Sequence, residues 1–127
     1  ACNQLMVAVN MMGAFEAVAL ARAAGVDPKV MREVLSSGAA RSGVLEAHAL
    51  RYIEGNLEPG FRAELMRKDL GIAAAVGAHY RRSQPATGLA HQLLVAACNS
   101  GFAKLDSAAL GLLYDQMNGT DDERSTR

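Results

Sequence analysis

The chain has 127 residues, of which half are apolar and one fifth are charged, and its 13 basic residues balance 13 acidic ones. A chain of this length suits one domain that buries roughly 65% of the surface exposed by its unfolded form. Zero formal charge argues against the clustered excess of Lys and Arg with which proteins bind nucleic acids or anionic membranes. We therefore expect no nucleic acid and no membrane among its partners.

Two cysteines, Cys2 and Cys98, lie far apart along the chain. Their spacing matches neither a zinc site nor a disulfide framework, so we expect reduced thiols and no metal. No apolar run approaches the roughly 20 residues of a bilayer-spanning helix, and no secretory signal pattern precedes a hydrophobic stretch. These features predict a soluble, cytoplasmic protein.

The first predicted element is a long helix over residues 1–24, since this stretch carries helix-forming residues and a single Gly13. Gly25 ends it as a C-terminal cap. At about 1.5 Å per residue it is a rod of roughly 36 Å, which we expect to cross the whole domain. Because it is apolar on nearly every side, we expect other helices or another subunit to bury it all round. Glu16, its lone acid, is expected to have a structural partner.

Further helices follow, each with a recognisable start. Asp27, Ser42 and Asp106 can cap helices with their side-chain oxygens, and Pro28 and Pro85 suit first-turn positions. The expected helices cover residues 28–35, 42–53, a stretch after Gly60 that runs to 82, 85–100 and 106–117. No segment alternates like a strand, and no glycine-rich loop follows a strand. The predicted fold is all-α, with a helical domain over 1–118 and a disordered tail over 119–127.

Two places carry polar groups suited to a ligand. Asn3 and Gln4 put adjacent amides at the start of an otherwise apolar helix, where they offer donors and acceptors to a small polar ligand. The alternative is a frayed helix end. Lys68 and Asp69 follow Phe61 by seven and eight residues, so Phe61 and Lys68 share a face if the helix has begun by Phe61. An ammonium beside an aromatic ring suits a nicotinamide dinucleotide, and a surface ion pair is the alternative.

Several short segments follow one another along the chain in a characteristic order and spacing. They are Asn3-Gln4, Glu16-Ala17, Ala24-Gly25-Val26-Asp27-Pro28, Ser36-Ser37-Gly38, Pro59-Gly60-Phe61, Lys68-Asp69-Leu70 and Asp106-Ser107-Ala108. Between Ala1 and about Leu113, this order resembles the C-terminal helical domain of the β-hydroxyacid dehydrogenases. That family includes 3-hydroxyisobutyrate dehydrogenase, tartronate semialdehyde reductase and 6-phosphogluconate dehydrogenase. The resemblance implies a helical bundle like the C-terminal domain of 6-phosphogluconate dehydrogenase, with a long N-terminal helix.

The resemblance also implies a division of labour between two domains. In such enzymes an N-terminal Rossmann domain, absent from this chain, binds NAD or NADP, and a catalytic Lys lies three residues before an Asn. That Lys would directly precede Ala1, so the resemblance implies no catalytic residue within this chain. It implies substrate binding by Asn3 and Gln4, and cofactor binding by Lys68, Phe61 and Asp69.

The implied reaction is reversible hydride transfer between nicotinamide and a small 3-hydroxy acid, in a parent chain of which this piece alone is inactive. The implied partners are the chain's own Rossmann domain and further copies, in a homodimer or homotetramer built through the long helix. Two alternatives stay open. One is a non-enzymatic helical association module, motivated by the apolar first helix. The other is the equivalent domain of an imine-reducing relative, although Lys68-Asp69 favours the hydroxyacid branch.

Overall fold

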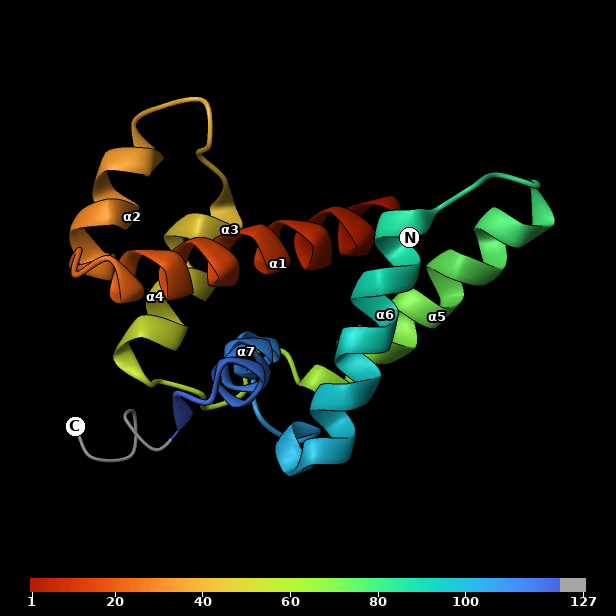
Figure 1. Cartoon of the computed structure of the whole chain (residues 1–127). Helices are drawn as coiled ribbons and strands as arrows, with labels where there is room; N and C mark the ends of the chain where they lie inside the picture. The colour runs from red at the N-terminus through yellow and green to blue at the C-terminus, as the bar shows by residue number, and fades with distance from the viewer. Residues whose placement is uncertain (122–127) are drawn as a thin grey trace.

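The computed structural model describes residues 1–121, which contain helices and no strand, so the all-α prediction is confirmed. The helices are α1 (Cys2–Ala23), α2 (Pro28–Ser36), α3 (Gly43–Glu46), α4 (His48–Glu54), α5 (Ala63–His79), α6 (Pro85–Ala97) and α7 (Leu110–Asn118). A π-type turn, η1 (Cys98–Phe102), and a 3-10 turn, η2 (Ser107–Ala109), lie between α6 and α7 (Figure 1). Residues 122–127 of the predicted disordered tail lie outside the described part of the chain.

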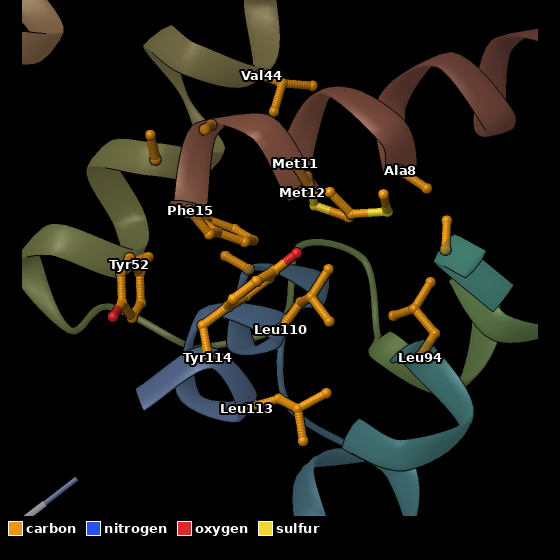
Figure 2. Close-up of a cluster of buried hydrophobic side chains, with 14 of the residues drawn as sticks. Ala8, Met11, Met12, Phe15, Val44, Tyr52, Leu94, Leu110, Leu113 and Tyr114 are labelled. Carbon is orange, nitrogen blue, oxygen red and sulfur yellow. The ribbon is translucent and has the colours of Figure 1, made fainter. Parts of the chain in front are cut away.

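Helix α1 is the centre of the fold, and each of the other α-helices contacts it. Helices α2, α3 and α4 gather around its C-terminal half, whereas the α5–α6 hairpin extends from its N-terminal half (Figure 1). Ala8, Met11, Phe15 and Val18 recur at helical spacing on α1 and are fully buried. They form one core with apolar side chains of α3, α4, α6 and α7, drawn in Figure 2.

One face of α1 stays exposed, so the prediction of burial all round is wrong for the chain's own helices. Met6 is 58% exposed and Leu20 is 71% exposed. The other helices cover only the opposite face, and burial by another subunit stays a prediction. By length and composition α1 is also apolar enough to cross a bilayer, contrary to the sequence-based expectation, although a core helix meets the same criterion.

The middle of the chain forms two short helices where one was expected. Ser42 caps the first of them as predicted, since its Oγ accepts the N–H of Leu45 at 2.9 Å. The helix then breaks at Ala47, between α3 and α4. Arg32 of α2 donates to the carbonyl oxygens of Leu45 and Glu46, at 3.2 Å and 2.7 Å. These carbonyls have a partner outside their own helix, which favours ending α3 there.

Phe61 lies before α5, which begins at Ala63. A shared helical face with Lys68 required the helix to have begun by Phe61, so that prediction is wrong. Asp106 explains this, because its Oδ1 accepts the N–H groups of Gly60 and Phe61, both at 3.0 Å. The carbonyl of Phe61 in turn accepts the N–H of Ser107 at 2.7 Å. With both backbone groups bonded to the η2 region, Phe61 cannot join the helix. Asp106 also caps η2, and α7 follows that turn directly.

Candidate functional site

The first turn of α1 meets the middle of α5 through a chain of side-chain hydrogen bonds. Gln4 Nε2 donates to Asp69 Oδ2 at 3.0 Å, across 65 residues of sequence. Asn3 Nδ2 donates to Gln4 Oε1, also at 3.0 Å. Three of the five predicted site residues therefore lie together, although they were assigned to two different ligands.

The three side chains have a defined hydrogen-bond polarity. An ionised carboxylate only accepts hydrogen bonds, so Asp69 holds the amide N–H of Gln4 and turns the Gln4 oxygen toward Asn3. Asn3 uses one N–H on that oxygen. Its carbonyl oxygen and its second N–H remain, on an exposed side chain, for a hydroxyl or carboxylate group of a ligand.

Lys68 lies next to this group in sequence, on an exposed face of α5. Leu65, Lys68, Ile72 and Val76 follow one another at spacings of three or four residues, which places them on one helical face. The three apolar members are 42%, 50% and 42% exposed. Within residues 1–121 Lys68 forms no salt bridge, so the alternative of a surface ion pair finds no support. An unpaired ammonium within an apolar surface suits contact with an anionic ligand that covers it.

Phe61 is half-buried against the core and is not brought into the group formed by the amides. Its backbone is fixed by Asp106 and Ser107, at the start of α5. Lys68 lies roughly 8 Å further along the axis than the first residue of α5, at about 1.5 Å per residue. The structure thus supports no direct pairing of the aromatic ring with the ammonium.

A pocket of about 1040 Å³ opens at the other end of α1. The C-terminal half of α1, the end of α4 and helix α7 form its walls. Its lining includes Glu16, Leu20, Arg22, Glu54, Tyr114 and Asp115. Sequence reasoning missed this pocket, because its residues come from three separate segments.

Hydrogen bonds hold the polar groups of this pocket in place. Tyr114 Oη donates to Glu16 Oε2 at 2.8 Å, which confirms a structural partner for Glu16. Burial raises the pKa of Tyr114, and the hydrogen bond to Glu16 raises it further. Tyr52 Oη donates to Asp115 and accepts from Arg22 Nη1 at 3.0 Å. Of the residues that line this pocket, the sequence analysis had singled out only Glu16, as a lone acid in an apolar helix.

Metal and thiol chemistry find little support in the described residues. Among residues 1–121, no three His, Cys, Asp or Glu side chains gather as metal ligands. Cys2 and Cys98 are both free thiols. Burial raises the pKa of Cys98, which lowers its thiolate fraction at neutral pH.

Comparison with known proteins defines the class. Residues 1–114 match the family described as NAD-binding of NADP-dependent 3-hydroxyisobutyrate dehydrogenase. The chain therefore belongs to this family of β-hydroxyacid dehydrogenases, which confirms the resemblance seen in its motifs.

Individual relatives differ in the substrates that their names state. The chain is 35% identical over 108 residues to 2-hydroxy-3-oxopropionate reductase of Escherichia coli, covering 85% of this chain and 37% of that protein. It is 30% identical to 2-(hydroxymethyl)glutarate dehydrogenase of Eubacterium barkeri, covering 92% of this chain and 39% of that one. The crystal structure of a 3-hydroxyisobutyrate dehydrogenase from Salmonella typhimurium matches with a TM-score of 0.83 and 29% identity, covering 88% of this chain and 39% of that one. The chain thus spans about two-fifths of the length of these relatives.

Proposed function

We propose that residues 1–118 form the substrate-binding and oligomerisation domain of an NAD(P)-dependent 3-hydroxyacid dehydrogenase. Family membership and the names of the relatives support an oxidoreductase. The observation that carries the assignment to this site is the bonded group of Asn3, Gln4 and Asp69 beside Lys68. A nucleotide-binding domain of the parent chain would cover this group and complete the cleft.

Each residue has a distinct part in this proposal. Asn3 binds the hydroxyl of a small 3-hydroxy acid, and Gln4 supports Asn3 and lies near the substrate carboxylate. Lys68 offsets the negative charge of the dinucleotide or of the substrate. Asp69, which the resemblance assigned to the cofactor, instead orients the side-chain amides of Asn3 and Gln4. A nicotinamide bound here would supply the hydride chemistry, and the family's catalytic Lys, expected directly before Ala1, would move the proton.

The test uses the full-length parent enzyme with small 3-hydroxy acids and with both NAD and NADP. Replacement Asn3→Ala should lower kcat/KM by about a hundredfold, which is ~2.7 kcal/mol of transition-state binding. Asn99→Ala, at an exposed amide in η1, is the matched control and should change little. Equal effects of the two replacements, or no turnover of any 3-hydroxy acid, would contradict the proposal. Turnover of cyclic imines alone would favour the imine-reducing relatives.

Self-association is the second part of the proposal, in a homodimer or homotetramer built through α1. The exposed apolar side chains of Met6 and Leu20 on that helix support it. Light scattering at tens of micromolar tests it, and a clean monomer would contradict it. Such association without hydride transfer would favour a non-enzymatic module.

A cytoplasmic location, consistent with two free thiols, completes the proposal.

A further inference from the structure

The face of α1 that bears Asn3 has a simple order of side chains. Asn3, Met6, Val7 and Asn10 follow one another at spacings of three, one and three residues, so they share one helical face. The two ends of this series are amides, and the two middle members are apolar. Residues 1–15 include no charged side chain, since the first charged residue of α1 is Glu16. The face therefore presents an apolar surface between two amides.

Val7 lies one helical turn beyond both amides of the candidate site. It follows Asn3 by four residues and Gln4 by three, which are the two spacings at which helical side chains are neighbours, with Cβ atoms about 5–6 Å apart. Met6 follows Asn3 by three residues but Gln4 by only two, which turns it away from Gln4. Val7 is therefore the apolar side chain of this face that neighbours both amides.

The Val7 side chain has a defined shape. It is half-buried and packs against the core, so part of its surface stays open. A β-branched side chain in a helix has one strongly preferred χ1 rotamer, so Val7 presents its methyl groups in one arrangement. Met6, by contrast, is 58% exposed and unbranched, and its flexible thioether adapts to whatever covers it. Of the two apolar members, Val7 is the one suited to discriminate between ligands.

Helix α5 adds further apolar surface where it meets the N-terminal half of α1 (Figure 1). Leu65 precedes Asp69 by four residues and Ile72 follows it by three, so both neighbour the carboxylate that bonds Gln4. Their side chains are 42% and 50% exposed. Gln4 and Asp69 already bond each other, whereas the apolar groups beside them are open. The surroundings of the amides are thus largely apolar on both helices.

The connectivity of a 3-hydroxy acid relates this surface to the substrate. C1 carries the carboxylate, C3 carries the hydroxyl, and C2 carries the substituent that distinguishes one such acid from another. Under the proposed function, Asn3 binds the hydroxyl on C3 and Gln4 lies near the carboxylate. C2 is bonded to both of these carbons, so it lies between the two amides. Its substituent then meets the side chain that neighbours both amides, which is Val7.

We propose that Val7 is a specificity-determining residue of this domain, and that it selects a short alkyl substituent on C2 of the substrate. An apolar surface is stabilised by covering an alkyl group, whereas a hydroxyl placed there loses water without gaining a hydrogen-bond partner. Asn10, the next polar side chain on this face, lies about 10 Å from Asn3 along the helix axis, beyond the reach of a short substituent. The inference rests on the hydride-transfer part of the proposed function and names the substituent that the same site accepts.

A matched pair of substrates tests the inference in the full-length parent enzyme. 3-Hydroxy-2-methylpropionate and 2,3-dihydroxypropionate differ by a methyl against a hydroxyl group on C2. We expect kcat/KM of the unchanged enzyme to be at least about tenfold higher for the methyl compound. Val7→Thr keeps the branched shape and adds a hydroxyl, so it should lower this ratio by about tenfold. Both values come from one enzyme preparation, so the ratio does not depend on the folded fraction of a variant.

Val9→Thr is the matched control. Val9 is also half-buried and packs against the core, but it follows Asn3 and Gln4 by six and five residues and so lies away from both amides. This replacement should leave the ratio of the two substrates unchanged. Val7→Ala is a second variant, which opens space, and it should raise kcat/KM for a 2-propyl compound relative to the 2-methyl compound by about tenfold.

The outcomes separate the inference from the proposed function. A ratio that Val7→Thr leaves unchanged, equal changes in the Val7 and Val9 variants, or an unchanged enzyme that prefers the 2-hydroxy compound would each overturn the role of Val7. Hydride transfer with 3-hydroxy acids would survive all three results. Absence of turnover with every 3-hydroxy acid would overturn the proposed function and this inference together.

Discussion

A single carboxylate decides which atoms Asn3 can offer to a ligand. Asp69 accepts from Gln4 and so fixes the direction of both amides. Replacement Asp69→Asn keeps the shape but lets the new amide present either its oxygen or its nitrogen, so the order of donors and acceptors is lost. We expect kcat/KM for the hydroxy acid to fall by about tenfold in the parent enzyme, ~1.4 kcal/mol, with the dissociation constant of the dinucleotide nearly unchanged.

Steady-state kinetics and fluorescence titration of the reduced dinucleotide measure the two effects separately. Asp121→Asn, at another exposed carboxylate, is the control. Weaker dinucleotide binding with unchanged substrate kinetics would instead support the role in cofactor binding that the sequence suggested for Asp69.

At the scale of helices, the sequence predicted what local chemistry decides. Asp27 and Ser42 cap the helices that follow them, because an N-cap needs only a nearby backbone N–H. At the break between α3 and α4, Arg32 donates to the free carbonyls, and this partner from another helix could not be read from the local pattern.

The same limit applied to the candidate site. The sequence identified Gln4 and Asp69 separately, from the residue types that each place offers. Their hydrogen bond joins residues 65 positions apart, and only the packing of α1 against α5 creates it. Phe61 was placed by helical spacing, whereas the distant Asp106 decides where the helix begins.

Packing of α7 against α4 provides a test at the scale of helices. At Gly111 on α7, an added Cβ would lie 2.3 Å from Tyr52 Cδ1. The Tyr52 ring is 1% exposed and packs edge to face on Phe15, so it has no room to move aside. Gly111→Ala should therefore lower the free energy of unfolding by about 2 kcal/mol in urea denaturation, despite the better helix propensity of alanine.

Gly88 in α6 is the matched control, because an added Cβ there meets no atom within 4 Å. Gly88→Ala should stabilise the protein by about 0.5–1 kcal/mol, through helix propensity alone. Similar effects of the two replacements, in either direction, would mean that α7 and α4 are not packed as closely as the structure has them.

At the scale of the whole molecule, the proposed function makes residues 1–121 one wall of a binding site. Within them there is no strand, and so no strand, glycine loop and helix N-terminus to bind a pyrophosphate. What they would offer a dinucleotide, under the proposed function, is the ammonium of Lys68 within the exposed apolar face of α5. A single charge contact at high solvent exposure contributes little binding energy, typically under about 1 kcal/mol.

The 127-residue chain alone should therefore bind NADH and NADPH at least about a hundredfold more weakly than the parent enzyme, a difference of ~2.7 kcal/mol. Fluorescence titration measures both constants, once circular dichroism and a cooperative melt have established that the isolated chain is folded. Comparable affinity of a folded isolated chain would place the dinucleotide site within these helices, and the division of labour between two domains would be wrong. Loss of the weak residual binding in Lys68→Met, with the helical signal intact, would identify the ammonium as the one contribution of this wall.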